Sequence, residues 1–222
     1  MRRKEDCNVS ITLLAVYSVL FYLAWTAFHF FAEPLISKIP NEAVSSLLSD
    51  GLIKNLIWTL PALILIRKNS DKLSVGFRDL FSFSKESLKY LWIFPAFAAY
   101  IIFGILIHGG TPGISSSFGA AEIITVIFVG ITEEVVFRGW LLNATVGRHE
   151  NAAIAINSVM FLAIHFPRWI CEGVFVSNFV TFGFISIVAL SVIFSLVFVR
   201  TKSLVLPITL HMFWDLLMFM LY

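Results

Sequence analysis

The chain has 222 residues, of which 59% are hydrophobic and only 14% are charged, and its mean hydropathy is +0.89. Soluble domains carry roughly 25% charged residues, so this composition excludes an ordinary soluble domain and predicts a polytopic membrane protein. The net charge of +2 is too small to indicate binding to nucleic acid. We therefore expect an all-α transmembrane helix bundle that forms a single membrane domain over residues 1–222.

Seven apolar segments follow one another along the chain, and we expect about seven transmembrane helices. The segments are 9–32, 52–67, 90–109, 120–145, 150–166, 177–200 and 203–222. The first is too long for the apolar part of a signal peptide, so we expect it to be retained. The second and fifth are short for a bilayer span and could extend into their flanks, and Pro61 would kink the second. The stretch 33–51 fits either a short interfacial helix or a loop.

Basic residues are concentrated in alternate loops. Before the first segment and after the second, fourth and sixth lie 12 of the 16 Lys and Arg residues, whereas the other loops hold only Lys38 and Arg168. The positive-inside rule then predicts a cytoplasmic N-terminus and, with seven spans, an external Tyr222. The two cysteines, Cys7 and Cys171, would lie on opposite sides of the membrane, so we expect two unpaired thiols.

Ionisable residues inside the apolar segments are the strongest functional signal. An ionisable side chain near the bilayer centre costs at least about 2.5–3.5 kcal/mol, and it faces the bundle interior or water. In the first three segments we identify only His29 and His108, both near helix ends, and we expect them to be interfacial. The later segments carry six such residues: Glu133, Glu134 and Arg138 in the fourth, His165 in the fifth, and His211 and Asp215 in the seventh. Because three helices each carry an expensive group, we expect a functional site.

The spacing of these residues predicts how they pair. Glu134 and Arg138 are four residues apart and share a helix face, so we expect an ion pair. His211 and Asp215 have the same spacing, and Asp215 could orient the imidazole ring. Glu133 lies about 100° around the helix from Glu134 and can face another helix. Helical rise places all the groups near one layer of the bundle.

Three ordered motifs carry a resemblance to a known family. Glu133-Glu134-x-x-x-Arg138, Phe161-x-x-x-His165 and His211-x-x-x-Asp215 resemble the motifs of the CAAX protease and bacteriocin-processing family of intramembrane proteases, also called CPBP or Abi. The resemblance covers about residues 120–219. It implies a division into N-terminal helices over 1–119 and catalytic helices over 120–222.

The resemblance implies a role for each residue. Glu133 would be the general base that activates water, with His165 helping to hold that water. His211 with Asp215 would stabilise the oxyanion, and Glu134 with Arg138 would be a supporting ion pair. The third motif ends in Asp215 where the prenyl-protein processing enzymes typically have Asn. An ionised carboxylate donates no hydrogen bond, so orienting His211 is the safer role for Asp215.

The motifs are compatible with a zinc site and with a metal-free mechanism. Glu133, His165 and His211 could bind zinc in a three-ligand site. The sequence has no HExxH motif, and we favour a glutamate mechanism without a metal. The expected activity is an intramembrane endopeptidase acting on a membrane-associated or leader peptide. The small size and minimal loops resemble those of bacterial members of the family, which implies a bacterial cell membrane.

Two other functions compete with proteolysis. The first is a non-catalytic bacteriocin self-immunity protein or membrane scaffold, since the family includes such members. The second is a proton-coupled transporter, which predicts paired broken helices and internal repeats that the sequence does not display.

Overall fold

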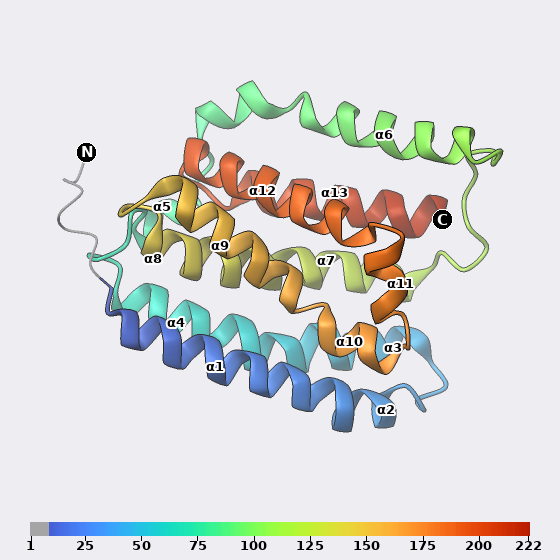
Figure 1. Cartoon of the computed structure of the whole chain (residues 1–222), viewed down its shortest axis with the longest axis horizontal. Helices are drawn as coiled ribbons and strands as arrows, with labels where there is room; N and C mark the ends of the chain where they lie inside the picture. The colour runs from blue at the N-terminus through green and yellow to red at the C-terminus, as the bar shows by residue number, and fades with distance from the viewer. Residues whose placement is uncertain (1–8) are drawn as a thin grey trace.

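Helices make up the fold of the computed structural model, which describes residues 9–222, and no strand occurs in that range. Figure 1 shows the longer helices lying side by side along one axis. In chain order the elements are α1 (Ile11–Ala27), η1 (Phe28–Ala32), α2 (Glu33–Ile36), α3 (Glu42–Ser46), η2 (Leu47–Ile53), η3 (Asn55–Thr59), α4 (Leu60–Lys68), α5 (Phe77–Leu80), η4 (Lys85–Tyr90), α6 (Ile93–Ile107), α7 (Ala120–Glu134), η5 (Val135–Leu142), α8 (Asn143–Thr145), α9 (Glu150–Ala163), α10 (Phe166–Cys171), α11 (Phe175–Val180), α12 (Gly183–Thr201) and α13 (Val205–Leu221). The predicted all-α class is confirmed.

Fewer helices than the seven predicted have both the length and the apolar composition needed to cross a membrane. Among the described residues, four helical runs are long and apolar enough, and a fifth is added if Phe77–Tyr90 and Ile93–Ile107, bent by 67°, form one span. The α13 helix has only 17 residues. The run over 120–145 carries several charged residues. The protein is an integral membrane protein, and the count of seven stays a prediction.

The second helix is longer than its apolar segment, because it starts well before residue 52. The α2 helix prolongs the first run to Ile36, and α3 begins at Glu42. The side chain of Asn41 accepts a hydrogen bond of 3.1 Å from the backbone N–H of Val44, which caps this start. Near Pro61, where a kink was predicted, a π-helical turn (η3) precedes α4 and accommodates the missing backbone donor.

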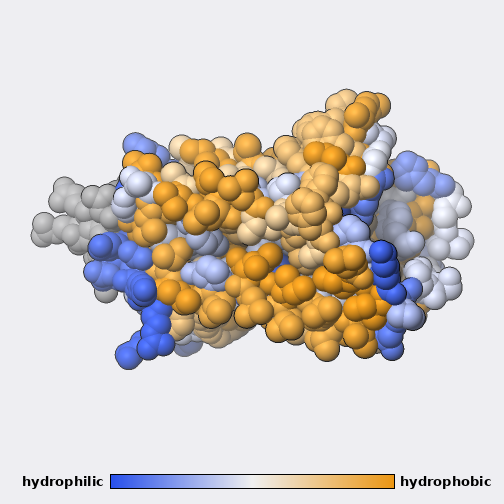
Figure 2. Space-filling view, turned by 90° about the horizontal axis from the view of Figure 1, so that it is seen from below, coloured by the Kyte–Doolittle hydropathy of each residue, from blue (hydrophilic) through white to orange (hydrophobic). Residues whose placement is uncertain are grey.

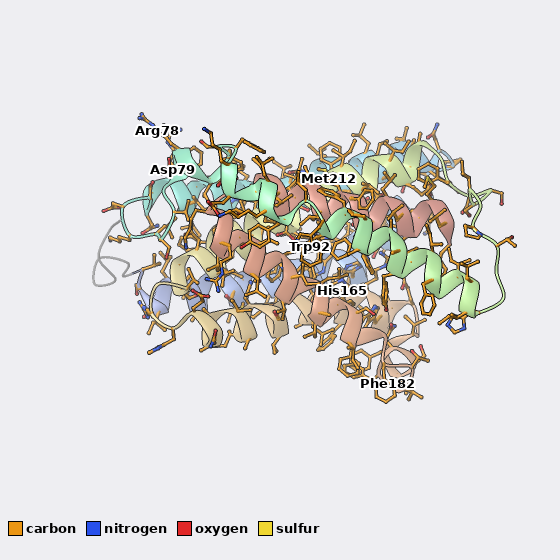
Figure 3. All side chains as sticks on the ribbon, turned by 90° about the horizontal axis from the view of Figure 1, so that it is seen from above. Arg78, Asp79, Trp92, His165, Phe182 and Met212 are labelled. Carbon is orange, nitrogen blue, oxygen red and sulfur yellow. The ribbon has the colours of Figure 1, made fainter. Side chains whose placement is uncertain are left out.

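The hydropathy of the surface changes along the long axis of the bundle. Figure 2 shows an apolar band in the middle and hydrophilic residues towards both ends. The basic loops after α4, α8 and α12 gather at the end where Figure 3 labels Arg78 and Asp79, whereas the α10 helix, which carries Arg168, lies towards the other end in Figure 1. This asymmetry agrees with the predicted orientation without testing it. Cys171 is an exposed free thiol, and Cys7 lies outside the described residues.

The central helix is α7, which packs against α13 on one side and against α3 and η2 on another. Gly130 makes the first of these contacts close. A Cβ atom at this residue would lie 2.6 Å from Cγ of Met212 and 3.3 Å from its backbone nitrogen. The same hydrophobic core joins both halves of the chain, since Phe21 and Trp58 belong to it together with Phe137.

Replacing Gly130 with alanine should therefore destabilise the bundle by about 1–3 kcal/mol, because the added methyl group overpacks the contact between α7 and α13. Thermal unfolding of the purified protein in detergent measures this effect. Gly113→Ala is the matched control, because nothing lies within 4 Å of a Cβ atom added there. Equal stability of the two variants would contradict the proposed role of Gly130.

Candidate functional site

The site is built around the junction between α7 and η5. Glu133 and Glu134 are the last two residues of α7, and Arg138 lies in the π-helical segment that follows. Short π-helical insertions are frequent at functional sites, since they change which side chains face a given neighbour. Here the change in helical phase falls directly after the two glutamates.

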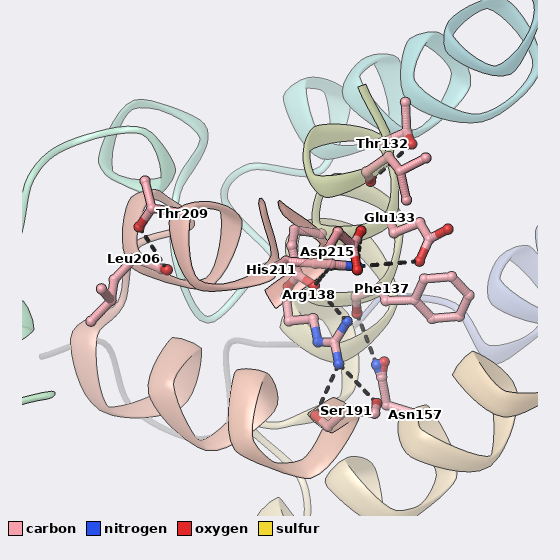
Figure 4. Close-up of polar contacts among 12 residues, drawn as sticks. Thr132, Glu133, Phe137, Arg138, Asn157, Ser191, Leu206, Thr209, His211 and Asp215 are labelled. Atoms are coloured by element: carbon pink, nitrogen blue, oxygen red, sulfur yellow. Dashed lines mark hydrogen bonds and ion pairs between the residues drawn. The ribbon is translucent and has the colours of Figure 1, made fainter. Parts of the chain in front are cut away.

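Glu134 and Arg138 form the predicted ion pair. Oε1 of Glu134 lies 2.9 Å from Nη1 of Arg138, and neither side chain has any solvent exposure. Nη2 of the guanidinium donates to the backbone carbonyl and to the hydroxyl of Ser191 on α12, at 2.9 and 2.8 Å. Figure 4 shows these bonds fanning out from the guanidinium. The pair therefore fixes α12 against the central helix.

His211 is held by Glu134 as well. Its Nδ1 lies 2.9 Å from Oε1 of Glu134, while its Nε2 lies 3.5 Å from Oδ2 of Asp215 and 3.8 Å from Oε2 of Glu133. The ring also stacks on Phe194, with 5.1 Å between centroids. The closest carboxylate is thus Glu134 rather than Asp215, whose distance exceeds that of an ordinary hydrogen bond. Orientation of His211 by Asp215 stays a prediction, and Glu134 is the partner with the tighter geometry.

Glu133 faces a cation that the sequence analysis missed. Its Oε1 lies 3.2 Å from Nζ of Lys54, which comes from the second helical run, and both side chains are less than 10% exposed. Only His29 and His108 were expected as ionisable residues in the first three segments, and Lys54 corrects that expectation. A usable signal was present: of the 16 Lys and Arg residues, Lys54 and Arg138 are the two that were not counted among the loop residues. Each of them pairs with one glutamate of the Glu133–Glu134 dyad.

His165 lies at the break between α9 and α10, just before Pro167. Its Nδ1 is 3.0 Å from the carbonyl oxygen of Phe161, the other residue of its motif. A carbonyl oxygen only accepts, so Nδ1 carries the hydrogen of this bond. In the neutral ring Nε2 is then an acceptor. This nitrogen is able to receive a hydrogen bond from water.

These side chains share one cavity of about 480 Å³. Glu133, His165, His211 and Asp215 all line it, and so does Lys54, whereas Glu134 and Arg138 lie behind its wall. His29 is only 2% exposed and lines this cavity, where its ring pairs with Glu33, and its interfacial depth stays a prediction. The three sequence motifs therefore converge on one internal space, together with polar residues from the first helical run.

The residues do not fit the zinc alternative. In the part of the chain that the structure describes, no three His, Cys, Asp or Glu side chains are grouped so that they could hold a metal ion. One oxygen of Glu133 is already bound to an ammonium group, which would repel a cation. No step of the chemistry below therefore runs through a metal.

Comparison with known proteins agrees with the motifs. Residues 115–217 match the family model described as type II CAAX prenyl endopeptidase Rce1-like. No curated protein and no solved structure matches the chain significantly. The matched range contains all three motifs and all six intramembrane residues identified from the sequence. Over residues 115–217, which is a little under half of its length, the chain is similar to the CAAX protease family.

Proposed function

We propose that this protein is an intramembrane endopeptidase in which Glu133 activates water to hydrolyse a peptide bond. The observation that carries the proposal is that Glu133, His165, His211 and Asp215, from three separate helical runs, line one cavity inside an apolar bundle. Ionisable groups are expensive in such surroundings, and convergent polar groups in a pocket are typical of an active site. The substrate we propose is a membrane-associated or leader peptide.

The chemistry starts at Glu133. Because Lys54 occupies Oε1, Oε2 is the oxygen that takes a proton from water. The second hydrogen stays on the water oxygen and donates a hydrogen bond to Nε2 of His165. The water oxygen adds to the carbonyl carbon of the scissile bond, and the carbonyl oxygen becomes an oxyanion. When the intermediate collapses, the C–N bond breaks and the amine takes the proton from Glu133.

The oxyanion needs a donor, and His211 is the residue we assign. Its Nδ1 is bound to Glu134, so it donates from Nε2 only as an imidazolium. Glu134 supplies the counter-charge, and Asp215 at 3.5 Å adds a second carboxylate beside the ring. A donor fixed in this way stabilises developing charge without reorganising during the reaction.

Glu133→Gln should abolish cleavage, with a loss of about 100-fold or more, because an amide of the same shape accepts no proton from water. New peptide termini in the membrane proteome of cells that express the wild-type protein or the variant measure this loss by mass spectrometry. Glu122→Gln is the matched control, since Glu122 lines the same cavity but takes no part in the mechanism. Processing at the wild-type level by Glu133→Gln would refute the glutamate mechanism.

The competing function is that of a non-catalytic immunity or scaffold protein. A double variant, Glu133→Gln with His165→Ala, separates the two functions because it removes both groups that hold the water. Loss of peptide processing in this variant supports proteolysis. Wild-type immunity or signalling in the same variant would support the non-catalytic function instead.

Metal dependence gives an independent test of the mechanism. The purified protein should keep its cleavage activity after treatment with a strong chelator and should gain none from added zinc, because the geometry around Glu133 does not fit a metal ion. Cleavage of a membrane peptide is followed by mass spectrometry before and after treatment. Activity that disappears with the chelator and returns with zinc would overturn the metal-free mechanism.

A further inference from the structure

Lys54 is an unusual residue for its place in the fold. It joins the π-helical segments η2 and η3 in the middle of a long helical run, and only 4% of its surface is exposed. A lysine within an apolar segment costs free energy unless it is paired or reaches water. A lysine at this position therefore needs a compensating partner, and it also indicates a functional role.

The partners of Lys54 are one carboxylate and two indole rings. Nζ lies 3.2 Å from Oε1 of Glu133, 5.1 Å from the ring centroid of Trp25 and 4.7 Å from that of Trp58. Aromatic faces stabilise a desolvated cation, and Trp is the best of them. The ammonium group is thus held in one position from three directions.

The two ion pairs of the dyad differ in where they lie. Glu134 and Arg138 are completely buried behind the cavity wall, whereas Lys54 and Glu133 line the cavity itself. A purely structural need for charge compensation could be met behind the wall, as Arg138 meets it for Glu134. The Lys54 pair instead reaches the space in which substrate and water would meet.

We propose that Lys54 is the positioning residue of the general base: it binds Oε1 of Glu133 and so leaves Oε2 turned towards water and His211. This inference rests on the proposed function and adds a residue to it. Oε2 is the oxygen on the side of His211, at 3.8 Å from Nε2. The contact of Lys54 with Oε1, at 3.2 Å, is the shorter of the two, so Lys54 holds the carboxylate more firmly than His211 does.

Trp25 extends this positioning to His165. The indole N–H of Trp25 donates a bond of 2.8 Å to the carbonyl oxygen of Ile164, the residue directly before His165. The same indole lies against the ammonium group of Lys54. One tryptophan of the first helix therefore fixes both the cation behind the base and the backbone that carries the histidine.

Kinetics of Lys54 variants test the proposal on a membrane peptide that the wild-type protein cleaves. For Lys54→Met we expect kcat to fall about 100-fold, because the base is misplaced, with KM within about twofold of wild type. Lys54→Arg should recover about a tenth or more of the wild-type kcat, since it restores a cation beside Oε1. Lys38→Met is the control, because it removes an exposed lysine that does not line the cavity.

Thermal unfolding of the same proteins gives a readout that needs no activity. Lys54→Met should lower Tm, because it leaves the carboxylate of Glu133 buried and uncompensated. Adding Glu133→Gln to Lys54→Met should restore most of that loss, because the uncompensated charge is then gone. Independent, additive losses of Tm in the double variant would overturn the pairing.

The possible outcomes separate this inference from the function on which it rests. If the wild-type protein cleaves and Lys54→Met has an unchanged kcat, or only a raised KM, the positioning role is wrong and the proteolytic function stands. If wild type and Glu133→Gln both lack cleavage, the proposed function fails and the positioning role fails with it. A lowered kcat with rescue by arginine supports both.

Discussion

Charge compensation inside an apolar bundle is the constraint on which the rest of this structure depends. Two adjacent carboxylates in a membrane helix are tolerated only if each finds a cation or strong donors nearby. Glu134 pairs with Arg138, which lies four residues later in the sequence, and Glu133 pairs with Lys54, which lies 79 residues earlier. The ion pair between Lys54 and Glu133 holds the second helical run against α7. The two glutamates thus link α7 to its neighbouring helices as well as lying at the candidate site.

The ion pairs Glu134–Arg138 and Glu133–Lys54 have different roles in the site. Arg138 is shared between Glu134 and Ser191, so it stabilises the contact with α12 and keeps Glu134 available to hold His211. Lys54 faces the cavity and contacts one oxygen of Glu133 only. A completely buried pair therefore lies beside a second pair that lines the cavity. Preorganisation of this kind is what electrostatic catalysis requires.

Sequence reasoning succeeded where the relevant distance lies along the chain. Helical spacing predicted the pair Glu134–Arg138, and composition predicted the all-α membrane fold. It failed where the distance lies through space. Spacing favoured Asp215 as the partner of His211, whereas tertiary packing brings Glu134 closer, and no local pattern links Lys54 to Glu133. Spacing also did not show that helix packing closes over His29, which lies near a helix end and is only 2% exposed.

The family match and the site have different boundaries, and the difference has a physical meaning. Residues 115–217 hold the motifs, yet Lys54, Trp25 and Trp58 all lie before residue 115. A division at residue 119 into N-terminal and catalytic helices stays a prediction, and the geometry argues against assigning the chemistry to one side of it. A carboxylate base is defined by its surroundings as much as by its own side chain. If Lys54 sets which oxygen of Glu133 receives the proton, the catalytic unit includes the first two helical runs, and the C-terminal helices alone would contain the motifs without an oriented base.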